Sequence, residues 1–154
     1  MSVSHKVAVL IANGFNEKEL SVIQKKLISQ NMVAKMVSSE NGVVNGWADN
    51  SWGCFFSVDD SINQALASDY SGLIIMGGDK SIQRLLKTAH TERFVNSFVR
   101  VGKPVLALDD AHQVVSTEES VVTHVETVSQ DMGEVLDMFL VSVQGLDIEM
   151  DMAA

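Results

Sequence analysis

The sequence predicts one α/β domain of three layers, α/β/α, in which a mostly parallel β-sheet lies between two layers of helices. Short uninterrupted apolar runs, such as 7–12 and 105–108, are typical of strands that are covered on both faces. Segments with helical spacing of apolar residues alternate with these runs, as in sheets built from strand–helix–strand units. The 154 residues suffice for one buried core, and no linker, repeat or low-complexity tract divides them. We therefore expect a single domain over residues 1–154.

The first part of the chain is expected to contribute two strands and the helix between them. Val7–Ala12 predicts the first strand, which ends at an Asn-Gly turn. A helix is expected after Asn16, because acidic residues occupy its first turn and apolar residues then recur at helical spacing. The apolar stripe consists of Leu20, Ile23, Leu27 and Ile28. Met32–Val37 predicts the second strand.

The next segment is expected to be a polar connection that leads into a helix. Residues 39–53 are rich in Gly, Asn and Ser, which predicts a loop or a small hairpin around Val43-Val44. Phe55–Val58 predicts a short strand. Asp59-Asp60-Ser61 is typical of the cap of a helix, which we expect to run through Ala67.

The remaining strands and helices are expected to complete the sheet and the two helix layers that cover it. Gly72–Met76 predicts a third buried strand, followed by a short helix and a longer one at Thr91–Val101. Val105–Leu108 predicts the central strand, with helix from Asp110 onward. Val121–Val125 predicts a last strand.

The carboxy-terminal part is expected to be an amphipathic helix at Ser129–Val143. Its apolar stripe consists of Met132, Val135, Leu136, Phe139 and Leu140. The acidic stretch at about 144–154 is expected to be a loosely held tail.

Composition and charge exclude several classes of function. The net charge is −9 and the pI is near 4.7, whereas nucleic acids and anionic membranes bind basic surfaces. The first apolar run is too short to cross a membrane. Cys54 is the single cysteine, so no internal disulfide can form and a reducing cytoplasm is the expected compartment. Its aromatic neighbours favour a role as a small core residue.

Three turns are the candidate locations for a functional site. In parallel sheets, ligands and catalytic groups gather beyond the carboxyl ends of the strands. The turns that follow buried strands are Asn13–Glu19, Gly77–Lys80 and Asp109–His112. We therefore expect these three segments to lie together at one edge of the sheet.

Around these turns the sequence resembles the ThiJ/PfpI superfamily, whose members have the class I glutamine-amidotransferase-like, flavodoxin-like fold. The stretch KVAVLIANGFNEKEL is similar to the first strand, turn and E-x-E-L helix start of that superfamily. YSGLIIMGG is similar to its strand that ends in Gly-Gly, and GKPVLALDDAH to the strand and bend that carry its catalytic Cys. The resemblance covers Lys6–Val115 and implies the same fold.

The resemblance also implies which positions would form a catalytic site. The superfamily's carboxyl group corresponds to Glu19. Its Cys corresponds to Asp109, its neighbouring His to Asp110 and the following Gly to Ala111. A thiolate at such a bend is a strong nucleophile, whereas a carboxylate is a weak one. The amidase, protease, glyoxalase and deglycase activities of the superfamily are therefore not expected.

One branch of the superfamily, the carboxy-terminal domain of large-subunit catalases, resembles the chain more closely than the others. That domain carries KPIALAGDAR at the same bend and lacks the Cys, and Asp110-Ala111 matches its Asp-Ala pair. The short segment after Val115 and the acidic loop before the last helix also fit this branch. The haem-binding catalase core is missing, so the resemblance implies no haem and no decomposition of peroxide.

Two interpretations of the acidic bend are open. In the first, Asp110 caps a helix by accepting backbone N–H groups, and Asp109 fills the corner. In the second, Asp109 lies close to Glu19, as the resemblance implies, and the two carboxyls share a proton or bind Mg²⁺ or Ca²⁺. The spacing of the four His residues does not support a structural metal site.

The turn Gly77-Gly78-Asp79 has two interpretations as well. By resemblance it orients backbone N–H groups toward an oxyanion or another ligand. Without a nucleophile, glycine's permissive backbone explains it as a tight strand-to-helix turn.

We therefore expect a non-catalytic module that forms a homodimer and has a stress-related structural, chaperone-like or ligand-binding role. Trp47 and Trp52 would form a partner surface if they are exposed. The alternative is a small hydrolase or glyoxalase-type enzyme that uses Glu19, Asp109 and His112 for acid–base chemistry.

Overall fold

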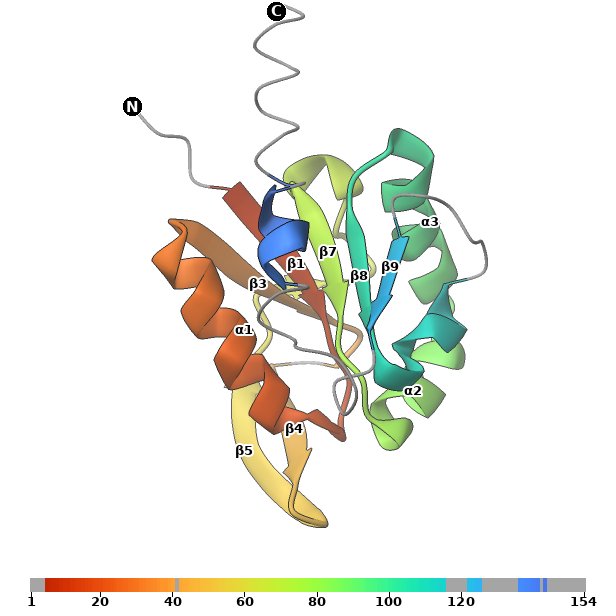
Figure 1. The fold of residues 1–154 in the computed structure, drawn as a ribbon. Helices are drawn as coiled ribbons and strands as arrows, with labels where there is room; N and C mark the ends of the chain where they lie inside the picture. Colours follow the sequence, from red (N-terminus) through yellow and green to blue (C-terminus); the bar gives the residue numbers. More distant parts are fainter. Residues whose placement is uncertain (1–4, 41, 116–121, 126–135, 142, 144–154) are drawn as a thin grey trace, which may run out of the picture.

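The computed structural model describes residues 5–40, 42–115, 122–125, 136–141 and 143, and its centre is a parallel sheet (Figure 1). The strand order is β6-β3-β1-β7-β8-β9, and every neighbouring pair is parallel. The strands are β1 (His5–Leu10), β3 (Met32–Ser38), β6 (Asp60–Ser61), β7 (Gly72–Ile75), β8 (Val105–Leu108) and β9 (Val122–Val125). The prediction of a mostly parallel sheet is confirmed.

Helices cover both faces of this sheet (Figure 1). Helix α1 (Glu17–Ser29) and the helical residues 136–141 and 143 cover one face, and α2 (Asp79–Leu86) and α3 (Thr91–Val101) cover the other. This arrangement confirms the three-layer α/β/α architecture.

The alternation of side chains along β1 explains why its apolar run is continuous. Val7 and Val9 pack in the cluster that contains Leu20 of α1, whereas Ala8 and Leu10 pack in the cluster that contains Phe98 of α3. All six side chains have no exposed surface. Burial of each large apolar side chain stabilises the fold by about 1.5–3 kcal/mol, so both faces of β1 contribute to the core.

A second, smaller sheet contains most of residues 39–53, for which the sequence predicts a loop or a small hairpin, and the hairpin is the alternative that the structure has. Its order is β2 (Phe15–Asn16), β4 (Val43–Ala48) and β5 (Ser51–Ser57), and β4 and β5 form an antiparallel hairpin. Asp49 and Asn50 close the hairpin with φ values of 52° and 59°. Two consecutive left-handed residues are typical of the type I′ turn that joins paired strands. Both strands are therefore longer than the sequence predicts.

The helix expected at Asp59–Ala67 is not formed. The Asp59 carboxylate accepts the N–H of Met36, and its own N–H donates to the Met36 carbonyl, so this segment pairs with the edge of the sheet as β6. Asp60 accepts the hydroxyl of Tyr70 instead of capping a helix. Only a short 3₁₀ helix, η1 (Ala67–Asp69), follows.

The end of the chain agrees with the prediction where it is described. β9 confirms the last strand, and residues 136–141 and 143 confirm the final helix in part. The expected helical residues 129–135 and the expected acidic tail at 144–154 lie outside the described residues. None of the helices in the described ranges has the length and apolarity that a membrane span requires.

Candidate functional site

The three turns singled out by the sequence meet at the carboxyl edge of the sheet. They follow β1, β7 and β8, which are neighbours in the strand order. The N–H of Asn16 donates to the Gly77 carbonyl at 2.9 Å, which joins the first turn to the second. A Cβ atom at Gly78 would lie 2.7 Å from the Gly14 carbonyl oxygen, so this approach requires glycine. The prediction that these segments gather is confirmed.

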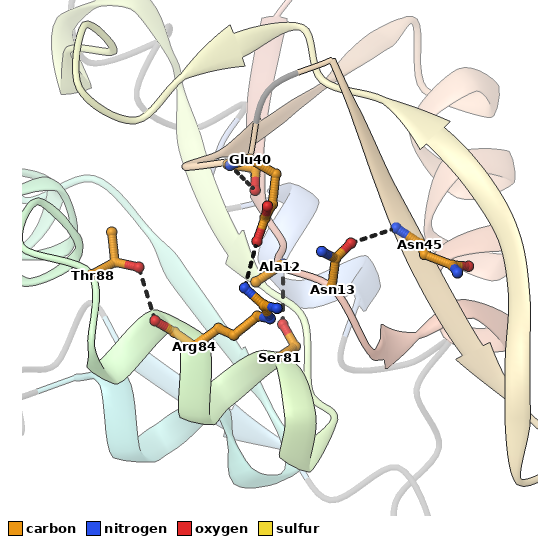
Figure 2. Close-up of polar contacts among 8 residues, drawn as sticks. Ala12, Asn13, Glu40, Asn45, Ser81, Arg84 and Thr88 are labelled. Carbon is orange, nitrogen blue, oxygen red and sulfur yellow. Dashed lines mark hydrogen bonds and ion pairs between the residues drawn. The ribbon is translucent and has the colours of Figure 1, made fainter.

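The turn after β1 is held on two sides by polar contacts, which Figure 2 shows. The backbone N–H of Ala12 donates to the hydroxyl of Ser81, a fully buried residue of α2, at 3.1 Å. The side-chain oxygen of Asn13 accepts the N–H of Asn45 from β4 at 2.8 Å. The first turn is thus fixed to α2 and to the hairpin before any ligand binds.

Asp109 occupies the bend after β8 in a left-handed backbone conformation, with φ of 51°. A 3₁₀ helix, η2 (Asp109–Val114), starts at this residue. Aspartate tolerates positive φ better than most residues, yet the conformation stores some strain. The sharp corner implied by the resemblance is therefore present, with a half-buried carboxylate in place of a thiol.

Asp110 links the third turn to the second. Its Oδ1 accepts the N–H of Gly78 at 2.9 Å. A Cβ atom at Gly77 would lie 2.8 Å from the Leu108 carbonyl oxygen, so Gly77 is required for the two turns to approach this closely. The acceptor role expected of Asp110 exists, but its donor belongs to the neighbouring turn and not to the helix that Asp110 was expected to cap.

Glu19 lies on α1 and lines a pocket of about 310 Å³ together with Asn16, Lys18, Trp47 and residues 48–50. Its side chain is half-buried, and its Oε2 atom is buried. The closeness of Glu19 to Asp109, and any Mg²⁺ or Ca²⁺ between them, stay predictions. The side chain of His112 lies outside the described part of the structure. Within the described ranges, no group of three or more His, Cys, Asp or Glu residues is arranged to hold a metal ion.

Glu17 has a role that the sequence analysis missed. Its carboxylate accepts the N–H of Cys54 where two residues of β5 face one residue of β4, an irregularity that releases this N–H from the ladder. Cβ atoms at Gly46 and Gly53 would lie 2.8 Å and 2.6 Å from Glu17 atoms, so the two glycines form a cradle for this side chain. The spacing of glycines on either side of the hairpin turn was the signal that could have revealed it.

The tryptophan pair and the cysteine lie on the hairpin next to this site. Trp47 and Trp52 meet edge to face with ring centroids 5.1 Å apart, and the Lys80 ammonium lies 4.9 Å from the Trp47 centroid. Trp52 is 52% exposed, whereas Trp47 is half-buried, so only Trp52 meets the exposure that a partner surface requires. Cys54 is exposed, so the expectation that it fills the core is wrong. It lies on an edge strand of the small sheet, outside both core clusters.

Comparisons with known proteins agree with this architecture. The sequence profile of the DJ-1/PfpI family matches residues 5–143. One solved structure is a two-domain protein from Anabaena variabilis with DJ-1/ThiJ/PfpI-like and ferritin-like domains, which has 24% sequence identity to this chain and a TM-score of 0.65. The match covers 72% of this chain and 31% of the Anabaena protein. Oxidized DJ-1 from Toxoplasma gondii has 22% identity and a TM-score of 0.63, over 73% of this chain and 59% of its own.

A ThiJ/PfpI domain protein from Brachyspira murdochii has 16% identity and a TM-score of 0.65, over 75% of this chain and 64% of its own. This chain therefore spans less than two thirds of the length of each of these structures, and at these identities the likeness shows the fold alone. No curated protein matches the sequence significantly.

Proposed function

The chain belongs to the DJ-1/PfpI family, and from this membership together with the altered bend we propose that it is a non-catalytic binding module of that family. In this proposal the acidic residues of the bend hold the turns together and do not react with a substrate. A thiolate owes its reactivity to its polarisability and its depressed pKa, and a carboxylate at position 109 supplies neither for the attack on a carbonyl.

The hydrogen bond from Gly78 N–H to Asp110 Oδ1 carries this proposal. An oxyanion hole needs preorganised N–H donors aimed at the place where negative charge develops. Here the Gly78 donor already binds a carboxylate, so negative charge occupies its acceptor position. A developing oxyanion would be repelled at this point, which supports a binding role over acyl-transfer chemistry.

The pocket between α1 and the hairpin is where we place a small-molecule ligand. Its volume of about 310 Å³ is at the lower end of ligand sites, and its lining combines Trp47 with the charged residues Lys18, Glu19 and Asp49. The match of Asp110-Ala111 to the catalase carboxy-terminal domain supports a stress-related or chaperone-like role without haem. The single cysteine supports a reducing, cytoplasmic location.

We further propose that the chain forms a homodimer through the open edge of β5. This seven-residue strand carries no charged residue, and Phe55 on it is 68% exposed. Edge strands without charges or proline pair readily with other strands. In a protein of net charge −9, an uncharged strand is where a second copy meets the least repulsion.

Light scattering after size exclusion should give a dimer for the wild type and a monomer for Phe55→Lys, and a monomeric wild type would contradict this part.

The second candidate function is a hydrolase or glyoxalase-type enzyme that uses Glu19, Asp109 and His112. The left-handed backbone of Asp109 favours it, because strained residues cluster at active sites. Such an enzyme would use these groups for proton transfer to or from a carbonyl or amide substrate.

Turnover assays decide between the two candidates. Purified protein is tested for glyoxalase, deglycase and amidase activity, together with Glu19→Gln, Asp109→Ala and the control Asp137→Asn on an exposed helical residue. The binding module should show no turnover in any variant. Turnover in the wild type and the control that either site substitution abolishes would overturn the proposal.

A further inference from the structure

The tryptophan pair of the hairpin has the geometry of a site for a positive charge. Trp47 of β4 and Trp52 of β5 are cross-strand partners, and their rings meet at 90° with centroids 5.1 Å apart. The Lys80 ammonium lies 4.9 Å from the Trp47 centroid and 6.0 Å from the Trp52 centroid. Tryptophan attracts cations more strongly than the other aromatic rings, and clusters of such rings recognise quaternary ammonium ligands. The two rings therefore stabilise a cation in this place.

Lys80 is held only weakly against the tryptophan pair. It is an exposed residue in the first turn of α2, where the helix dipole disfavours a positive charge. Within the described ranges its ammonium forms no ion pair that would fix its position. A contact between an exposed cation and an aromatic ring is itself weak. A cation that a ligand brings can therefore displace the Lys80 ammonium at little cost.

The pocket between α1 and the hairpin favours the same sign of charge. Trp47 belongs to the tryptophan pair and also lines this pocket of about 310 Å³. The one lysine in the lining, Lys18, forms an ion pair with Asp49 at 2.5 Å. Glu19 adds a second carboxylate, so the lining carries one more negative than positive charge. In a protein of net charge −9, such a lining attracts cations and repels anions.

We propose that the ligand of this pocket is a small organic cation of the substituted-ammonium class. Its charged group takes the place of the Lys80 ammonium against Trp47 and Trp52, and its body enters the pocket that Trp47 lines. This inference rests on the proposed binding function, because it names the class of ligand for the same pocket.

Intrinsic tryptophan fluorescence reports on this pair alone, because Trp47 and Trp52 are the two tryptophans of the sequence. The full chain is titrated at constant ionic strength with choline, and separately with 3,3-dimethyl-1-butanol, which has the same shape without the charge. Choline should change the fluorescence in a saturable way. It should bind about two- to fivefold more tightly than the neutral alcohol, which is the ratio expected for one exposed contact between a cation and an aromatic ring.

Three variants locate the binding site. Lys80→Gln removes the competing ammonium, so it should bind choline more tightly than the wild type does. Trp52→Leu keeps an apolar side chain but removes one of the two rings, and it should weaken choline binding about two- to fivefold. The matched control is Lys25→Gln, which removes the same charge from an exposed lysine of α1 and should bind choline like the wild type.

Absence of a saturable change with choline in both the wild type and Lys80→Gln would overturn the inference. Equal affinities for choline and the neutral alcohol would overturn it as well, but would leave a binding pocket in place. Weaker choline binding by Lys80→Gln than by Lys25→Gln would show that Lys80 only anchors the hairpin, which also contradicts the inference. If Trp52→Leu fails to fold, the comparison of the two lysine variants decides. The turnover assays test the non-catalytic function separately, so the two proposals can fail independently.

Discussion

Replacement of Asp110 by Ala should destabilise the protein, because it leaves the buried N–H of Gly78 without its acceptor. Hydrogen bonds to charged groups contribute about 1.5–3 kcal/mol. Because Asp110 is half-buried, water can replace part of the lost interaction. We therefore expect a loss at the lower end, about 1.5–2 kcal/mol in the free energy of unfolding. Asp110→Asn keeps a neutral acceptor and should lose about 1 kcal/mol or less.

Urea unfolding followed by circular dichroism measures this loss, provided that the slope of the transition is unchanged. For a chain of this length, the same loss lowers the melting temperature by about 3–8 °C. Hydrogen exchange adds a local readout, because the Gly78 amide should exchange faster in Asp110→Ala than in the wild type.

Gln113→Ala is the matched control, since Gln113 is an exposed residue of the same 3₁₀ helix. It should change stability by no more than about 0.5 kcal/mol. If Asp110→Ala were no less stable than this control and its Gly78 amide stayed protected, the link between the two turns would be refuted.

Substitutions at three further positions test other contacts. Glu17→Ala should cost about 0.5–1.5 kcal/mol, because the contact is exposed and water replaces part of it, and it should speed amide exchange at Cys54, since it removes the acceptor of that N–H; unchanged exchange would contradict the anchoring role. Asp109→Gly should be more stable than Asp109→Ala by about 1 kcal/mol in urea unfolding, because the bend is left-handed, and equal stabilities would argue against strain there. Burial and the hydrogen bond to Asp60 raise the pKa of Tyr70 above its ordinary value of 10.0, so the folded state holds this proton where the unfolded state has lost it. Stability should therefore fall as the pH rises above about 10, more steeply than in Tyr70→Phe, and parallel pH profiles would speak against the shift.

The sheet could be predicted because its signals are local. A strand buried on both faces needs apolar residues at every position, and β1 shows that pattern over consecutive residues. Parallel strands end at the same edge of a sheet, and because β1, β7 and β8 are neighbours, the three turns that follow them come together. The change from strand to helical pattern predicts a corner at Asp109, and the left-handed backbone of this residue agrees with that prediction.

The sequence does not predict the local structure correctly where a partner far along the chain decides it. Asp59 looks like a helix cap, but its carboxylate accepts the N–H of Met36 in β3, so the segment pairs with the edge of the sheet. Glu17 looks like a first-turn acid, and its partner Cys54 lies 37 residues away. For the segment around Asp49-Asn50 the sequence predicts a loop or a small hairpin, and two consecutive residues that tolerate positive φ are the turn signal that favours the hairpin.

The corner at position 109 has a consequence for attempts to restore sulfur chemistry. A thiol introduced at this position would lie on the existing sharp bend, at the start of η2. It would also face the Asp110 carboxylate, whose negative charge opposes loss of the thiol proton. Asp109→Cys alone should therefore react slowly with iodoacetamide at neutral pH, and Asp109→Cys with Asp110→Asn should react faster. We therefore expect the reactivity of a thiol at this bend to depend on the charge at position 110 as well as on the bend itself.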